Sequence, residues 1–243
     1  MIIAISQRQD LNKHGGWMDN LENSYNSYFS SFGITLIPIP NFPERVGDYF
    51  SKISFDGIVL SGGNDVCPRS YNEEINLQGC SLQRDNTEKR MLEIAVQRKI
   101  PVLGICRGMQ FINVFFGGKL QRDINKEKAV HQLGIVHEIK IIDEKAKIFL
   151  GREVSRANSF HNQAVTFENI SPRFKVFAVS DAWEEKEEEI EEKQLGGRFV
   201  EGLYHPSLPI VGVQWHPERE SPDKEINEKI MKAFVERKWV WES

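Results

Sequence analysis

The sequence has little cysteine, no long apolar run and little net charge, and each shortage excludes a class of protein. Its 243 residues include three cysteines without CxxC spacing, Cys67, Cys80 and Cys106. We therefore expect neither a disulfide framework nor a zinc site, and at least one free thiol. No apolar run approaches the roughly 18 residues of a membrane span. The N-terminal apolar stretch is too short for a secretory signal, so we expect a cytoplasmic protein.

Charge and composition favour a globular protein that binds small molecules. The formal net charge is −4, with 40% hydrophobic and 27% charged residues, which argues against a broad nucleic-acid-binding face. No Pro- or Ser-rich linker and no repeat at solenoid periods divides the sequence. We expect one domain over residues 1–243, small-molecule partners rather than nucleic acid or membrane, and no metal or other cofactor. The sequence does not indicate an oligomeric state.

Short β-rich runs alternate with helical patterns through the first half of the chain. This alternation predicts βα units in a parallel sheet, and the near-continuous apolar strands fit a sheet covered on both faces. We therefore expect an α/β fold, with a flavodoxin-like open, mainly parallel sheet flanked by helices and mixed β additions in the C-terminal half. The expected strands are 2–6, 34–40, 56–63, 101–106, 136–143, 173–180 and 209–215. The expected helices are 17–32, 43–52, 84–99, 107–117 and 222–239.

One cysteine stands in a pattern that predicts a nucleophile. The segment "PVLGICRGMQ" runs from a predicted strand through Gly104, Cys106 and Gly108 into a predicted helix. Gly-x-Cys-x-Gly at such a junction is the thiol counterpart of the hydrolase nucleophile elbow. The helix N-terminus favours thiolate over thiol, and the backbone N–H of Arg107 would point at an oxyanion. The alternative is a cysteine packed as a small hydrophobe.

A thiolate that attacks an amide needs a general acid, and one histidine has the required neighbour. His216 in "GVQWHPE" ends an apolar strand, with Glu218 two residues later. Residues i and i+2 of an extended segment project to the same side, so this carboxylate can orient the imidazole. His205 in "YHP" lacks an acidic residue at that spacing and is the weaker candidate.

These residues resemble the motifs of a known family. "GICRGMQ" and "GVQWHPE" are similar to motifs of class I glutamine amidotransferases, whose glutaminase domain carries a Cys-His-Glu triad. "VLSGGNDVCPRSYNEE", "RDNTE", "GGKLQRDI" and "NSFHNQAV" resemble, in the same order, motifs of the branch that hydrolyses γ-glutamyl amides on its own. The likeness spans roughly residues 55–218, and several blocks in order are far more specific than one motif.

The resemblance implies roles for individual residues. Cys106 would be the nucleophile, His216 the acid/base and Glu218 its orienting carboxylate. The backbone N–H groups of Gly63 and Arg107 would form the oxyanion hole. The positions that match those holding the α-amino and α-carboxylate groups of the glutamyl moiety are Gln110, Ser159, Phe160 and His161.

The resemblance also implies a hydrolase that releases glutamate through a cysteine thioester. The best candidate substrate is γ-glutamyl-CDP-amidate, which would give cytidine diphosphoramidate for modification of capsular polysaccharide. γ-Glutamyl-γ-aminobutyrate is an alternative, weakened because Ser61 stands where many relatives have proline and Asn162 where a second histidine is common. Arg8, Lys13 and His14 could meet a diphosphate, although solvated surface cations are the favoured interpretation.

Two functions of other kinds remain open. The chain could be a glutaminase subunit that passes ammonia to a synthase. No synthase domain is recognised in this sequence, so that synthase would be a separate protein. The chain could also be a non-catalytic redox sensor that uses Cys106, but this hypothesis leaves "WHPE" unexplained.

Other features receive a structural interpretation or none. Arg84, Asp85 and Glu88 in "RDNTE" are expected to orient loops through charge-assisted hydrogen bonds rather than to act in catalysis. The acidic run 184–193 is expected to be a solvated helix or hairpin face. Trp17 either lines the pocket or packs in the core.

Overall fold

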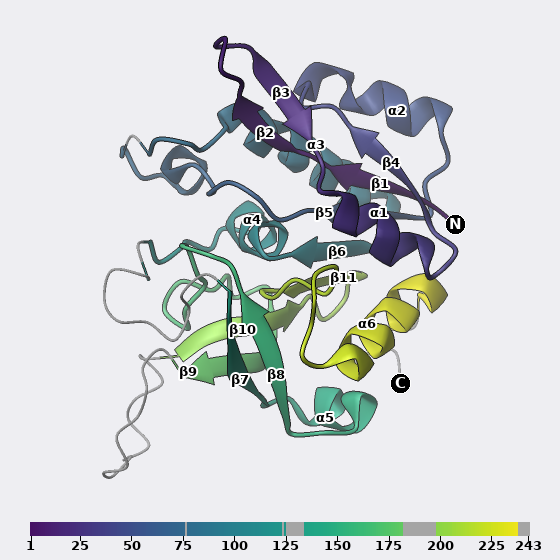
Figure 1. Cartoon of the computed structure of the whole chain (residues 1–243), viewed down its shortest axis with the longest axis vertical. Coiled ribbons are helices and arrows are strands. Elements are labelled where there is room, and N and C mark those ends of the chain that lie inside the picture. Colours follow the sequence, from purple (N-terminus) through teal and green to yellow (C-terminus); the bar gives the residue numbers. More distant parts are fainter. Residues whose placement is uncertain (76, 123, 125–133, 182–197, 238–243) are drawn as a thin grey trace.

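The computed structural model describes residues 1–75, 77–122, 124, 134–181 and 198–237. Within these residues the main feature is a nine-stranded sheet in the order β4-β1-β5-β6-β11-β10-β9-β7-β8 (Figure 1). Its strands are β1 (Ile2–Ser6), β4 (Thr35–Ile39), β5 (Gly57–Leu60), β6 (Val102–Ile105), β7 (Ile135–Ile141), β8 (Val154–Ser159), β9 (Lys175–Asp181), β10 (Arg198–Tyr204) and β11 (Ile210–Val213).

The sheet is parallel over one half and antiparallel over the other. Strands β4, β1, β5, β6 and β11 run parallel, whereas β10, β9, β7 and β8 each run antiparallel to their neighbours. The parallel half corresponds to the βα alternation of the sequence, together with one strand from near its end. The expected α/β fold, a mainly parallel sheet with mixed β additions from the C-terminal half, is therefore confirmed.

Helices cover both faces of the sheet. Successive residues of a strand point to opposite faces, and both faces are apolar. In β1, Ile3 and Ile5 belong to one buried cluster and Ala4 to the other. The first cluster is covered by α1 (Asn23–Ser30), α5 (Glu144–Leu150) and α6 (Lys224–Glu236). The second is covered by α2 (Val46–Lys52), which follows a 3₁₀ turn at Pro43–Arg45, and by α3 (Leu82–Arg98) and α4 (Arg107–Phe115).

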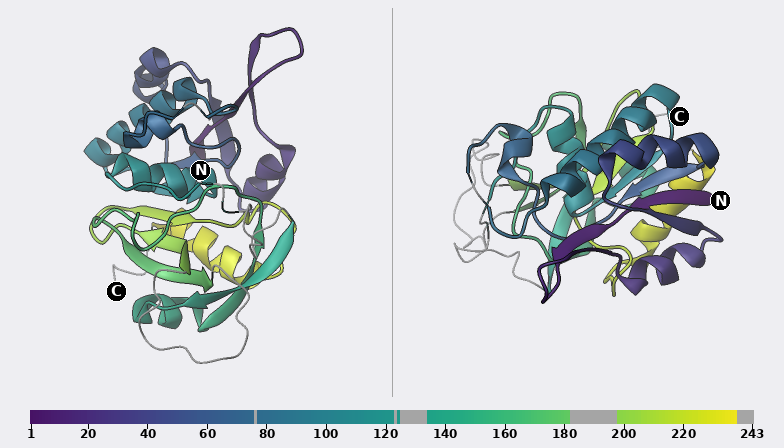
Figure 2. Two further views of the ribbon diagram at one scale, coloured as in Figure 1. Left: turned by 90° about the vertical axis from the view of Figure 1, so that its left-hand side faces the viewer. Right: turned by 90° about the horizontal axis from the view of Figure 1, so that it is seen from above.

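The first expected helix is partly wrong. Residues 17–32 contain α1, but their first four residues form β3 (Trp17–Asn20), which pairs with β2 (Arg8–Leu11) in an antiparallel hairpin. The turn forms because the Asn12 side chain accepts hydrogen bonds from the backbone N–H groups of His14 and Gly16. The hairpin projects beyond the sheet (Figure 2). Trp17 on it is 56% exposed, so packing in the core is excluded.

The pairing of two cysteines is a second correction. Cys67 and Cys80 form a disulfide, and Cys106 is the free thiol. The bond closes the loop between β5 and α3, which contains a 3₁₀ turn at Pro68–Tyr71. Spacing did not predict it because the two cysteines are brought together by the path of this loop and not by a local motif.

Some helices and strands of the structure were not expected from the sequence, and one expected segment lies outside the described residues. Strands β8 and β10 and helix α5 were not expected, while the last expected helix is found as α6, with Asp223 as its N-cap. The acidic run 184–193 lies outside the described residues. Among the described helices, none combines the length and apolar character that crossing a bilayer would require.

Candidate active site

Three neighbouring parallel strands deliver the predicted site residues to one edge of the sheet. β5, β6 and β11 are adjacent, with Leu60 beside Gly104 and Ile105 beside Val213. Gly62 and Gly63 follow β5, Cys106 follows β6 and His216 follows β11 shortly after each strand ends. Adjacent strands lie only about 4.8 Å apart, so these turns meet at the carboxyl edge, where open α/β sheets bind ligands.

Cys106 stands on a strained turn, as the elbow pattern predicts. Its backbone has φ 52° and ψ −108°, an uncommon conformation for a residue with a side chain. A Cβ on Gly104 would lie 2.7 Å from the backbone nitrogen of Met109, and one on Gly108 would lie 2.1 Å from the carbonyl oxygen of Leu60. Both glycines are therefore needed because α4 packs directly against the strands.

The Cys106 thiol has a defined polar neighbour at the start of α4. The cysteine is 3% exposed, and the Nε2 amide of Gln214 donates toward its Sγ at 3.5 Å. Because Cys106 is the N-cap of α4, its side chain lies at the positive end of the helix dipole.

His216 and Glu218 form a buried pair. The imidazole Nδ1 lies 2.6 Å from Oε1 of Glu218. Burial lowers the pKa of His216, but the charges of Glu218 and Cys106 outweigh that effect and raise it to about 10. The imidazolium is thus favoured at neutral pH. Asn158 accepts from the His216 N–H at 2.8 Å and donates to its carbonyl at 3.0 Å, which fixes the backbone.

The turn after β5 lies against the histidine and is held by a tyrosine. A Cβ on Gly62 would lie 2.7 Å from Cε1 of His216, so the imidazole packs on this turn. The Gly62 N–H donates to the hydroxyl of Tyr25 at 2.8 Å. Burial, followed by the charge of Glu218, raises the pKa of Tyr25 well above its usual value, so the phenol stays neutral. Sequence reasoning missed Tyr25, because α1 carries no motif that distinguishes it.

The four residues expected to hold the glutamyl group form the surroundings of this site. Gln110 donates from Nε2 to the carbonyl of Gln163 at 2.6 Å and to Oε1 of Gln214 at 3.1 Å. Phe160 meets His216 edge to face, with ring centroids 5.6 Å apart. Ser159 and His161 flank it and are buried.

Two glutamines connect these residues, and the sequence analysis missed both. Gln163 accepts from the backbone N–H of Val66 at 2.8 Å and donates to its carbonyl at 3.0 Å, which ties the segment after β8 to the loop after β5. Gln214 contacts both Gln110 and Cys106. Gln163 falls within the quoted "NSFHNQAV" block and Gln214 within "GVQWHPE", so their place in those blocks was the available signal.

The remaining candidates take other roles. His205 accepts backbone N–H bonds of Ser207 and Leu208 at Nδ1 and packs against the rings of Phe116 and Phe174, which is a structural environment. Burial and the charge of Arg173 lower the pKa of His205. Among the described residues, no cluster of histidine, cysteine and carboxylate side chains has the arrangement of a metal site.

A comparison with protein families assigns the chain to a known group. The model of the peptidase C26 family matches residues 1–218. The chain belongs to this family. The match begins well before the motif blocks that carry the resemblance in the sequence, so it also includes the hairpin and α1.

Individual proteins are similar to this chain in sequence or in fold. A Schizosaccharomyces pombe protein named as a glutamine amidotransferase, PB2B2.05, is 35% identical over 199 residues, which cover 76% of this chain and 71% of that protein. The γ-glutamyl-CDP-amidate hydrolase of Campylobacter jejuni is 30% identical over 184 residues, 76% of this chain and 72% of that enzyme. The acivicin-bound glutaminase domain of Trypanosoma brucei CTPS has a TM-score of 0.63 and 18% identity, and it covers 99% of this chain and 96% of that domain.

Two positions that depart from the usual motifs of these hydrolases have defined contacts. The Ser61 hydroxyl donates to the carbonyl of Ser6 at 2.9 Å, and the Ser61 N–H donates to Oγ of Ser6 at 2.9 Å. Asn162 donates to the carboxylate of Asp65 at 3.3 Å. Both departures therefore join the loop after β5 to neighbouring segments.

Proposed function

We propose that this peptidase C26 family member hydrolyses the γ-glutamyl amide bond of a small glutamyl conjugate, with Cys106 as the nucleophile. The observation that carries the proposal is the setting of His216. Its Nδ1 is paired with Glu218, and Cys106 raises its pKa both through its charge and through a side-chain hydrogen bond. A nucleophile, an acid/base and an orienting carboxylate are the parts that amide cleavage requires.

The proposed reaction has two steps. In the first, the Cys106 thiolate attacks the γ-carbonyl carbon, the C–N bond breaks, and His216 gives its Nε2 proton to the departing nitrogen. The products are a γ-glutamyl thioester and a free amine or amidate. In the second, His216 takes a proton from water, the hydroxide attacks the thioester, and glutamate leaves as the thiolate is restored.

The charge state of His216 supports the first step. A general acid must carry its proton at working pH, and a pKa of about 10 keeps this imidazole protonated beside Glu218. Glu218 accepts the proton on Nδ1, so the proton on Nε2 is the one available to the leaving nitrogen. Glu218 acts as the positioning carboxylate of the pair.

The two N–H groups expected to stabilise the oxyanion are those of Gly63 and Arg107. Gly63 is exposed at the turn after β5, and Arg107 opens α4 immediately after Cys106. Gln110, Ser159, Phe160 and His161 are assigned to the glutamyl group, whose α-amino and α-carboxylate charges need polar partners. Removal of one oxyanion donor typically costs about 10²–10³-fold in kcat.

γ-Glutamyl-CDP-amidate is the proposed substrate, with cytidine diphosphoramidate as the leaving group. The support is the likeness to the Campylobacter jejuni hydrolase, which is 30% identical over 184 residues. Asn162, bound to Asp65, weakens the alternative γ-glutamyl-γ-aminobutyrate.

The test is an assay of the purified chain and its Cys106→Ala variant on γ-glutamyl-CDP-amidate, γ-glutamyl-γ-aminobutyrate and glutamine. Glutamate release from the first substrate, with essentially no turnover by the variant, is expected. Turnover of another γ-glutamyl amide alone would keep the reaction and discard this leaving group. Normal hydrolysis by Cys106→Ala would discard the mechanism, and glutamine hydrolysis that needs an added protein would favour an ammonia-supplying subunit.

A further inference from the structure

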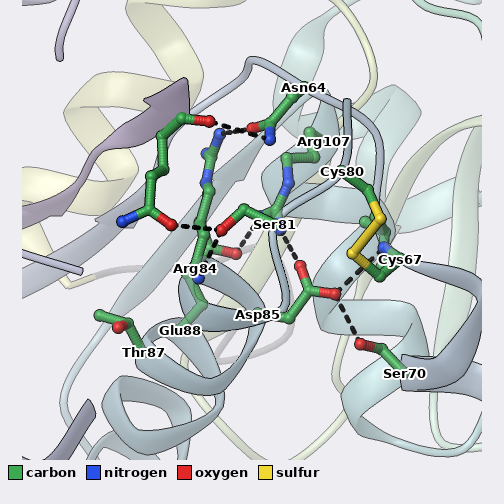
Figure 3. A network of polar contacts seen from close by, with 12 residues as sticks. Asn64, Cys67, Ser70, Cys80, Ser81, Arg84, Asp85, Thr87, Glu88 and Arg107 are labelled. Carbon is green, nitrogen blue, oxygen red and sulfur yellow. Dashed lines mark hydrogen bonds and ion pairs between the residues drawn. A yellow bond between two sulfur atoms is a disulfide. The ribbon is translucent and has the colours of Figure 1, made fainter. Parts of the chain in front are cut away.

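A buried cluster of four charges joins the start of α3 to the start of α4 (Figure 3) and contacts the turn after β5. Arg84, Asp85 and Glu88 come from the first turns of α3, and Arg107 from the first residue of α4. Their side chains are at most 2% exposed, and the two arginines balance the two carboxylates. The reaction proposed above assigns these side chains no step.

Arg84 holds the turn that carries one oxyanion donor. Its Nη2 donates to the carbonyl oxygens of Ser61 at 2.7 Å and Gly62 at 2.9 Å, and Nη1 donates to the side chain of Asn64 at 2.9 Å. The peptide that joins Gly62 to Gly63 is planar and trans, so its C=O and N–H point in opposite directions. By fixing the Gly62 carbonyl, the guanidinium directs the Gly63 N–H away from itself.

The close approach of Arg84 also explains the residue at the turn. Gly63 has φ 137°, and a Cβ there would lie 2.5 Å from Nη1 of Arg84. Side chains rarely adopt this φ, and the space for one is already filled. The guanidinium also polarises the peptides whose carbonyls it binds, which strengthens their N–H groups as donors.

The same charge cluster also fixes the residue that carries the second oxyanion donor. The backbone N–H of Arg107 is the other proposed oxyanion donor, and its guanidinium pairs with Asp85 and Glu88. Glu88 is the shared partner, since its other oxygen accepts from Nε of Arg84 at 3.0 Å. One carboxylate therefore connects the supports of both N–H groups.

Glu88 and Arg84 keep their charges at neutral pH. Burial raises the pKa of Glu88 in isolation, but Arg107 and Arg84 outweigh it and hold the pKa below its usual value. Burial and the neighbouring Arg107 lower the pKa of Arg84 only to about 10. Asp85 also accepts from the Cys67 N–H at 3.0 Å and the Ser70 hydroxyl at 2.5 Å, so it joins the disulfide-closed loop to the cluster.

We propose that Arg84 and Glu88 are positioning residues for the oxyanion hole: Arg84 orients the Gly63 N–H, and Glu88 ties Arg84 to Arg107 so that both donors keep one fixed separation. This inference rests on the proposed amide hydrolysis. It assigns the two side chains to stabilisation of the tetrahedral intermediate and not to substrate binding or thiol activation.

Arg84→Lys and Glu88→Gln test the assignment. Lysine keeps the charge but cannot hold two carbonyls with a planar fork, and glutamine keeps the shape but loses the charge that pairs both arginines. Arg98→Lys is the control, because Arg98 lies on the same helix and donates to a backbone carbonyl, that of Phe50, about 21 Å along the axis from Arg84.

Each variant is measured for kcat, KM and the rate at which iodoacetamide alkylates Cys106, a reaction that forms no oxyanion. We expect kcat to fall about 10- to 1,000-fold in Arg84→Lys and Glu88→Gln, with KM changed less than about threefold. Alkylation of Cys106 should stay within about threefold of the parent rate. Arg98→Lys should match the parent enzyme in all three quantities.

The outcomes separate this inference from the function on which it rests. A parent enzyme that hydrolyses no γ-glutamyl amide contradicts the proposed function. An active parent with folded variants of normal kcat overturns the positioning role. Equal losses in kcat and alkylation also overturn it, because they mean general disruption of the site. Circular dichroism checks that each variant is folded. If Arg84→Lys does not fold, Glu88→Gln alone decides the question, because it removes a charge and almost no volume.

Discussion

The protonation of His216 depends on two negatively charged partners. Glu218 lies 2.6 Å from Nδ1, and Cys106 contributes a second negative charge. Together they overcome the burial that would otherwise neutralise the ring. Because the pKa of His216 is raised to about 10, the imidazolium is present at neutral pH and is lost as the pH rises through that value.

Replacement of Glu218 should move this alkaline limit. In Glu218→Gln the carboxylate charge is gone and burial remains, so the pKa of His216 falls, and the alkaline limb of kcat/KM moves to lower pH by about one unit or more. Activity at neutral pH should fall as well, because less of the general acid is protonated. The pH profile of kcat/KM for both proteins measures this shift. An unchanged alkaline limb would mean that Glu218 does not control the histidine.

Tyr25 should contribute to the rate through the turn that it holds. Tyr25→Phe removes the acceptor of the Gly62 N–H, a hydrogen bond typically worth about 0.5–1.5 kcal/mol, so kcat/KM should fall about 2- to 10-fold. Tyr28→Phe is the matched control on the same helix, since its hydroxyl reaches the backbone of Asn227 on α6. Steady-state kinetics of both variants decide the question. Equal kinetics would exclude a role for the Tyr25 hydroxyl.

The sequence predicted the residues that carry distinctive motifs and missed those that only support them. Cys106 and His216 were identifiable because glycines flank one and a carboxylate follows the other at i+2. Tyr25 lies in an unremarkable stretch, and Asn158 begins the quoted block "NSFHNQAV" but had no role assigned to it. Their contacts with the site come from distant parts of the chain. Such contacts depend on tertiary packing, which no local pattern encodes.

The junction of β6 and α4 depends on the close approach of helix and strands. Gly108→Ala should be strongly destabilising, because its Cβ would lie 2.1 Å from the backbone oxygen of Leu60, and overpacking of this kind typically costs about 1–3 kcal/mol. Gly47→Ala, within α2, has open space around the new methyl group and should stabilise by about 0.5–1 kcal/mol. Denaturant unfolding of both variants measures the difference. Equal stability of the two variants would contradict this packing.

Elements with a strong apolar period were predictable, and elements defined by turns were not. Strands β1, β5 and β6 and helix α3 follow from continuous apolar runs and helical spacing. Strand β3 was predicted as the start of a helix and β2 was not predicted, because their residues lack clear alternation and the turn between them is made by hydrogen bonds to Asn12. Strand β8 has few apolar residues, so its sequence resembles that of a loop. Two of its six residues are exposed.

At the scale of the whole molecule, the site depends on strand order. Cys106 comes from the middle of the chain and His216 from near its end, yet β6 and β11 are parallel neighbours. The sequence predicted both strands but not their adjacency, because pairing between distant segments is set by the complete sheet. The antiparallel half then supplies Ser159 to His161 from β8 and the segment after it.

The central claim is that Cys106 carries the γ-glutamyl group during turnover. The direct measurement is mass spectrometry of peptides from enzyme quenched in acid while it turns over γ-glutamyl-CDP-amidate or another γ-glutamyl amide that it hydrolyses. The account predicts one added γ-glutamyl group on the Cys106 peptide of the parent enzyme and none on Cys106→Ala. Hydrolysis at a normal rate with the adduct on another residue, or with Cys106 replaced, would contradict it.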